Sequence, residues 1–262
     1  MLLGILIWAV AAITAALFLA RPWFPAAVSE HARAFDSQFH LTLAMTGAMF
    51  LLAQLLLGIA ILRARRRTKA LHSEGNTRWE IAWTLATAAL FLGAMAWSTP
   101  LFTAVHLGGP RPGALRVEAL ARQFSWNFRY PGPDGRFARL DLKQINDAGG
   151  NPFGLDENDT ASKDDIVAAA LRVPAGRDVE LTLRGRDVIH NFFVRELRLK
   201  QDVVPGMLIP LRFRADVPGT YEVACSELCG LGHHLMRTVV IVMPPAGFAA
   251  WEREALAELR QE

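Results

Sequence analysis

The chain has 262 residues, of which 52% are hydrophobic and 20% charged. Its formal net charge of +3 comes from residues 1–100, where 8 Lys and Arg face 4 Asp and Glu, whereas residues 101–262 hold 20 against 21. The sequence therefore offers no basic groove for nucleic acid, and its apolar excess before residue 100 indicates a membrane protein.

Three early stretches are long enough to cross a bilayer, which takes about 20 apolar residues. They run over residues 2–20, 40–62 and 81–97, and none contains Asp, Glu, Lys or Arg. The first has the alternative of a cleaved signal peptide, but no basic segment precedes it, so we expect a retained helix. Residues 1–100 are thus predicted to be a transmembrane helical region.

A basic run, RARRRTK, at residues 63–69 sets the expected orientation. Basic residues in short loops stay on the cytoplasmic side of a membrane. We therefore expect a multi-pass protein of a bacterial-type inner (cell) membrane, with everything after about Ser98 on the periplasmic, outer face.

From about residue 114 the pattern becomes that of strands, which are short, rich in β-branched or aromatic residues and separated by Gly and Pro. This spacing predicts a sandwich or barrel of antiparallel strands over residues 101–262. A polar stretch at 143–165 is expected to be a surface excursion, and residues 245–260 have the spacing of a C-terminal helix. The expected strands cover residues 115–131, 167–174, 178–185, 207–216, 220–225 and 236–244.

The stretch CSELCGLGHHLM, from Cys225 to Met236, holds the only two cysteines of the chain. A disulfide between Cys225 and Cys229 would close very little chain and stabilise little. A zinc site would use both thiolates and His233. The thioether of Met236 is a soft ligand that suits copper instead, so this ligand set favours a copper electron-transfer site.

Such a site needs a further histidine from a distant strand, and DVIHNFF supplies His190. A histidine beside Phe192 and Phe193 is by itself more often a core residue, but the downstream cysteine motif favours a ligand. His234 is expected at the surface or behind the ligands. The remaining histidines, which we expect to be structural, are His31, His40, His72 and His106.

The combination of DVIH, KQDVVPG and CSELCGLGHHLM resembles subunit II of cytochrome c oxidase, the haem-copper oxidase subunit with a binuclear copper (CuA) centre. EIAWT at residues 80–84 and QFSWNFRY at residues 123–130 also match, so the likeness spans about residues 40–245. It implies a cupredoxin-like Greek-key β-sandwich or barrel behind the membrane helices.

The resemblance also implies the role of each ligand. Cys225 and Cys229 would bridge both coppers, and His190 and His233 would each complete one. Met236 and the backbone carbonyl of Glu227 would be weak axial ligands, while the Glu227 side chain resembles the family's ligand to a magnesium or manganese ion at the subunit interface. The alternative for that side chain is an ordinary loop carboxylate.

Three further residues take expected roles from the same resemblance. Glu80 matches the start of a proton pathway, with an interfacial anchor as its alternative. Phe124 stands where the family commonly has the Trp of electron entry, so Phe124 and Trp126 are expected to form or flank the entry patch, with Trp126 as the conduit or simply a core residue. Met207 replaces a common Arg, and the first helix is additional to the usual two.

The implied function is that of a cytochrome c oxidase subunit, which takes electrons from cytochrome c and passes them to catalytic subunit I for proton-coupled oxygen reduction. The alternative is a membrane-anchored copper chaperone or thiol-disulfide protein. No CxxCH occurs, so no covalent haem is expected, nor is any cofactor beyond the metals. Salt-sensitive steering of the donor should be modest, because the outer domain is near neutral and its acidic cluster lies on the excursion, at Asp156, Glu157, Asp159, Asp164 and Asp165.

Overall fold

The computed structural model describes residues 2–65, 74–109 and 111–260. Contacts divide the chain into a helical unit, formed by residues up to 25 and 34–101, and a β-rich unit, formed by residues 26–33 and those from 102 onward. Part of the predicted cytoplasmic run, including Arg66, Arg67 and Lys69, lies outside the described residues, as does His72.

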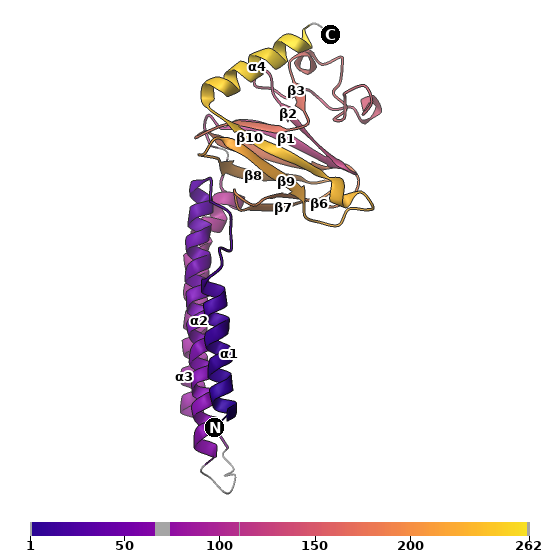
Figure 1. Ribbon diagram of the computed structural model, residues 1–262. Coiled ribbons are helices and arrows are strands. Elements are labelled where there is room, and N and C mark those ends of the chain that lie inside the picture. The colour runs from indigo at the N-terminus through magenta and orange to yellow at the C-terminus, as the bar shows by residue number, and fades with distance from the viewer. Residues whose placement is uncertain (1, 66–73, 110, 261–262) are drawn as a thin grey trace. The chain divides into compact units, whose positions relative to one another are not determined.

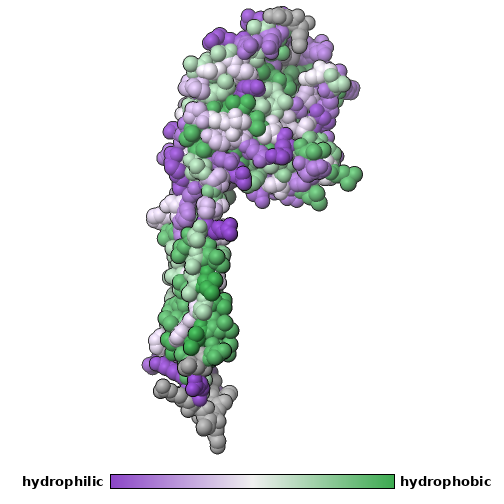
Figure 2. All heavy atoms as spheres, viewed as in Figure 1, coloured by the Kyte–Doolittle hydropathy of each residue, from purple (hydrophilic) through white to green (hydrophobic). Residues whose placement is uncertain are grey.

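The helical unit consists of three long helices: α1 (Leu2–Leu19), α2 (Glu30–Ala64) and α3 (Thr77–Phe102). Each is long and apolar enough to cross a membrane, and their visible surface is largely apolar (Figure 2). The three predicted spans are therefore confirmed as helices. Helices α2 and α3 continue beyond the predicted spans, because the prediction marked only their uncharged apolar stretches.

Helix α1 packs on α2 through two glycines that let the backbones approach closely. The Trp8 indole lies over Gly58, where an added Cβ would come within 2.2 Å of the ring, and Nε1 donates to the Gln54 carbonyl at 3.2 Å. Gly4 lies against Leu62 in the same way. Small residues at helix contacts are typical of membrane segments, where dispersion contacts replace the hydrophobic effect.

The β-rich unit is a sandwich of two five-stranded sheets (Figure 1). The first sheet has the order β3 (Ile166–Ala168), β2 (Ser125–Tyr130), β1 (Leu115–Arg122), β5 (Asp178–Gly185) and β8 (Leu208–Arg214). The second has the order β4 (Leu171–Pro174), β10 (Arg237–Met243), β9 (Gly219–Cys225), β6 (His190–Val194) and β7 (Leu199–Val203). Alternate residues of both sheets share one core, as Leu181 and Val223 illustrate.

The sheets depart from the predicted all-antiparallel pattern. Strand β1 runs parallel to β5, and β4 runs parallel to β10, because the chain crosses between sheets at several points and re-enters in the same direction. The predicted strand 115–131 is a hairpin of β1 and β2, whose turn at Gln123–Phe124 contains neither Gly nor Pro. The predicted strand 167–174 is likewise divided, between β3 in one sheet and β4 in the other.

A C-terminal helix, α4 (Pro245–Leu259), covers part of the sandwich and confirms the predicted helix (Figure 1). Its residue Phe248 is buried in the core of the sandwich, and its Trp251 ring lies edge-on to Tyr130 with ring centroids 5.1 Å apart. Four short helical turns complete the unit, at Thr103–Leu107, Leu142–Gln144, Thr160–Lys163 and His233–Leu235.

The polar excursion is anchored to the sandwich by a buried ionic cluster. Arg129 on β2 donates to Glu118 at 2.5 Å and to Asp165 at 3.3 Å, and all three side chains are nearly inaccessible. Removing one partner from such a cluster leaves a buried charge uncompensated, at a typical cost of about 3–5 kcal/mol. Asp165 therefore anchors the excursion, and its expected place in an exposed acidic cluster is wrong.

Candidate metal centre

The predicted ligands meet at one end of the second sheet. His190 is the first residue of β6, and Cys225 is the last residue of β9; the two strands pair with Phe192 opposite Cys225. The loop from Ser226 to Met236 connects β9 to β10, and the Cys225 N–H donates to the Met236 carbonyl at 3.1 Å. Sheet pairing thus brings together residues that are 35 positions apart in the chain.

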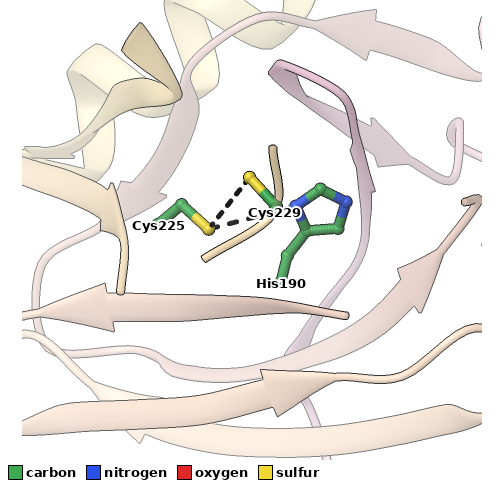
Figure 3. A group of neighbouring side chains, drawn as sticks. All are labelled: His190, Cys225 and Cys229. Carbon is green, nitrogen blue, oxygen red and sulfur yellow. Dashed lines mark hydrogen bonds between the residues drawn. The ribbon is translucent and has the colours of Figure 1, made fainter. Parts of the chain in front are cut away.

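The sulfur and nitrogen atoms of these side chains converge on a small volume. The two Sγ atoms lie 3.9 Å apart, and His190 Nδ1 lies 3.9 Å from Cys225 Sγ. Ligand atoms of these three residues all lie within 4.8 Å of one another, and Figure 3 shows the imidazole turned toward the sulfurs. This arrangement is a candidate metal site built from buried side chains.

The other predicted ligands surround the same two sulfurs. His233 Nδ1 lies 3.5 Å from Cys229 Sγ, and Met236 Sδ lies 3.8 Å from the same atom. The Glu227 carbonyl oxygen accepts from the Cys225 thiol at 3.2 Å. The structure therefore places all six predicted ligand groups together, with two of them near Cys225 and two near Cys229.

Both cysteines are free thiols, and their sulfur separation is far beyond the roughly 2 Å of a disulfide bond. Burial, and secondarily the neighbouring Cys225, raise the pKa of the Cys229 thiol to about 11. This thiol is therefore protonated in the metal-free chain at neutral pH, so a metal must displace its proton on binding. A buried thioether beside two thiols and two imidazoles fits copper better than zinc.

Asp187, which sequence reasoning did not single out, fixes the orientation of His190. Its Oδ1 lies 2.8 Å from His190 Nε2, and its Oδ2 accepts from the Gln123 N–H at 2.7 Å. Burial alone would raise the pKa of the Asp187 carboxyl, but hydrogen bonds from the Gln123 backbone, His190 and the Val188 backbone lower it. An ionised carboxylate accepts from Nε2–H, which leaves Nδ1 with a free lone pair facing the sulfurs.

A second hydrogen-bond chain holds the beginning of the ligand loop. Ser226 donates to Asn191 Oδ1 at 2.6 Å, and Asn191 Nδ2 donates to Asp202 at 2.6 Å. Ser226 directly follows the ligand Cys225, and Asn191 directly follows the ligand His190. Sequence reasoning missed them because a polar side chain next to a ligand has no pattern of its own; only strand pairing brings them into contact.

The two aromatic residues of the predicted entry patch differ in position. Phe124 is 36% exposed, whereas Trp126 is 3% exposed and lies in the core, with its ring centroid 6.4 Å from that of His190. The Phe124 ring lies over the ligand loop, where a Cβ added to Gly232 would come within 2.4 Å of it. Phe124 thus reaches the surface above the ligand loop, and Trp126 packs behind His190.

The other predicted roles concern groups that are not ligands of the copper site. The Glu227 side chain is exposed although its carbonyl faces Cys225, and His234 is exposed as expected. Glu80 lies in the first turn of α3, within the helical unit. Within the predicted acidic cluster, Asp156 and Asp159 both pair with Arg139, which reduces the negative charge they present.

Comparison with known proteins identifies the family to which the chain belongs. Residues 115–243 match the family described as cytochrome C oxidase subunit II, periplasmic domain. The alternative cytochrome c oxidase subunit 2 of Bradyrhizobium diazoefficiens is 33% identical over 246 residues, which are 92% of this chain and 87% of that relative. This chain belongs to the cytochrome c oxidase subunit II family. It is therefore a subunit of an oxidoreductase complex, and its family implies a copper centre.

Other members of the cytochrome c oxidase subunit II family give the same result. Cytochrome c oxidase subunit 2 of Thermostichus vulcanus is 33% identical over 88% of this chain and 77% of its own length. A crystal structure of the periplasmic domain of subunit II of cytochrome oxidase from Bradyrhizobium japonicum is 27% identical, with a TM-score of 0.42 over 57% of this chain and 98% of that one. The three apolar helices, together with the match of residues 115–243 to a periplasmic domain family, indicate a membrane-anchored subunit with its β-rich unit outside.

Proposed function

We propose that this subunit takes electrons from a cytochrome c at a binuclear copper centre and passes them to the haem-bearing catalytic subunit, where oxygen is reduced to water and protons are translocated. The observation that carries the proposal is the convergence of six ligand groups on the sulfurs of Cys225 and Cys229. When bound, a copper pair shares one electron between two metals in a rigid cage, so electron transfer needs little rearrangement.

In this proposal each ligand residue has a distinct role in holding the copper pair. Cys225 and Cys229 would hold both metals, with His190 and His233 as the further strong ligands. Met236 and the Glu227 carbonyl would supply the weaker contacts that tune such sites. Burial of His190 and Met236, both 0% exposed, excludes water from this cage.

The alternative of a copper chaperone or thiol-disulfide protein receives less support. That class places its cysteines early in a thioredoxin-like α/β fold, with the histidine after them. Here the cysteines follow eight of the ten strands, and His190 precedes them.

The direct test is metal analysis with electron paramagnetic resonance on the full-length chain, loaded with copper in detergent. We expect a copper pair in each chain and hyperfine structure from one electron shared by two nuclei. A signal from a single blue copper, or stoichiometric zinc in place of copper, would overturn the proposal.

We further propose that the exposed Glu227 carboxylate binds a magnesium or manganese ion at the junction with the catalytic subunit. Carboxylate oxygens are suitable ligands for either ion. The carbonyl and the side chain of one residue would then serve two metals from opposite directions. Failure of Glu227→Gln to change manganese binding in the assembled oxidase would exclude this role.

Glu80 is proposed to begin a proton pathway into the catalytic subunit, on the cytoplasmic side that the basic run predicts. Glu80→Gln is expected to slow oxygen consumption of the assembled oxidase while leaving reduction of the copper centre by its donor intact, because the substitution removes only a proton-carrying group. Glu74→Gln, three residues before α3, is the matched control. Equal losses in both activities would instead indicate faulty assembly.

A further inference from the structure

The turn between β1 and β2 supplies no metal ligand, yet one of its residues contacts both segments that do. Gln123 Nε2 donates to the Cys229 carbonyl at 2.5 Å. The backbone N–H of the same residue donates to Asp187 Oδ2 at 2.7 Å, and Asp187 Oδ1 holds His190 Nε2 at 2.8 Å. A single residue thus connects a cysteine of the ligand loop to the histidine of β6.

We propose that Gln123 is a positioning residue of the copper centre, which fixes Cys229 through its side chain and His190 through its backbone. The inference rests on the proposed copper site and extends it to a residue outside the ligand set. A carboxamide suits the task because it is neutral and has two N–H donors, whereas the isosteric carboxylate has none and would face the Cys229 carbonyl with a like partial charge.

The ligand loop is shaped to receive this side chain. A Cβ added to Gly230 would lie 2.8 Å from Gln123 Nε2 and 3.1 Å from the Phe124 ring. Gly230 also has a φ of +134°, a backbone conformation that residues with a Cβ rarely adopt. The glycine directly after Cys229 therefore lets the turn approach closely enough for the hydrogen bond to form.

The ligand loop is held by separate contacts at its beginning and within it. Ser226, beside Cys225, bonds to Asn191 on β6, while Cys229 is held by Gln123. Loss of the Gln123 side chain should therefore loosen Cys229 and leave Cys225 in place. Partners that orient metal ligands typically affect metal affinity by about 10–100-fold when removed, so we expect a loss of copper affinity in that range.

The first part of the test uses the metal-free, full-length chain in detergent, with the variants Gln123→Met, which keeps the length of the side chain, and Gln123→Glu. A thiol-alkylating reagent followed by mass spectrometry gives a separate labelling rate for each cysteine. We expect faster labelling of Cys229 with little change at Cys225. Gln144→Met, a glutamine of the excursion away from the ligands, is the control and should label as the parent chain does.

The second part uses the copper-loaded chain and measures copper affinity by chelator competition, together with the reduction potential and the paramagnetic spectrum. We expect weaker binding and a shifted potential in both Gln123 variants, at an unchanged melting temperature of the metal-free chain. Unchanged Cys229 labelling and copper affinity would overturn the inference, as would equal acceleration of both thiols with a lowered melting temperature. If the parent chain lacks the shared-electron signal, the proposed function fails, and the labelling comparison still decides the role of Gln123.

Discussion

Replacing either Cys225 or Cys229 by serine is expected to abolish the shared-electron copper signal completely. Each sulfur is proposed to bridge both metals, so removing one breaks the pair and not merely one bond. A serine hydroxyl is a hard, neutral donor and cannot replace a soft thiolate for copper. The measurement is electron paramagnetic resonance with copper quantification on each full-length variant.

Met236→Leu is the matched comparison, because it alters the same buried cluster without removing a bridge. Met236 Sδ lies 3.8 Å from Cys229 Sγ and is proposed as a weak axial ligand, so this variant should retain copper and change only the reduction potential. Circular dichroism of the metal-free chains should match the parent, since serine is nearly isosteric with cysteine. Survival of the shared-electron spectrum in either serine variant would contradict a bridging role for that thiol.

The candidate ligand set was largely predictable from the sequence because most of it is local. Four of its five side-chain members lie within twelve consecutive residues, so that spacing and residue type point to the site, whereas the Glu227 carbonyl was expected only from the family resemblance. His190 was predictable only because a copper site of this kind needs a histidine from a distant strand, since its approach to Cys225 depends on the pairing of β6 with β9. Helix spans were predictable for a similar reason, as hydropathy over about 20 residues is a local property.

The supporting residues were not predictable, because their contacts arise from topology. Gln123 lies in the turn between β1 and β2. Alternating apolar residues on both sides of this turn made the whole segment look like a single strand. The parallel pairing of β1 with β5 brings that turn beside the β5–β6 connection, which carries Asp187. The buried state of Asp165 has the same origin: an aspartate in a polar stretch gives no sign that Arg129 will meet it.

Steering of the donor by the β-rich unit should be weak. Its charges nearly balance, and its acidic cluster is reduced by the burial of Asp165 and the pairing of Asp156 with Arg139. The ligand loop, whose Gly230 and Gly232 lie against the Phe124 ring, instead exposes apolar side chains, with Leu228 at 79% exposure and Leu231 at 99%. We therefore propose that a cytochrome c docks mainly through apolar contact, with an association rate that changes little with salt.

Within this contact, Phe124 and Trp126 are proposed to act at different stages. Phe124 is the aromatic residue of the turn that reaches the surface, and its ring lies on the backbone at Gly230 and Gly232. Trp126 is buried with its ring tilted 63° to that of His190. The exposed ring is placed to touch a donor, whereas the buried indole is placed to couple the turn electronically to a ligand.

Phe124→Ala is therefore expected to weaken donor binding, and Trp126→Phe to lower the maximal rate of copper-centre reduction at saturating donor. Truncating an aromatic residue at the centre of an interface costs about 2 kcal/mol or more, which corresponds to a roughly thirtyfold lower second-order rate constant for Phe124→Ala. Stopped-flow reduction by a soluble cytochrome c, over a range of donor concentration and ionic strength, separates the two effects. The paramagnetic spectrum must match the parent in each variant, so that a displaced ligand loop is not mistaken for slow transfer. An unchanged maximal rate in Trp126→Phe would leave Trp126 as a core residue only, and unchanged donor affinity in Phe124→Ala would remove Phe124 from the docking surface.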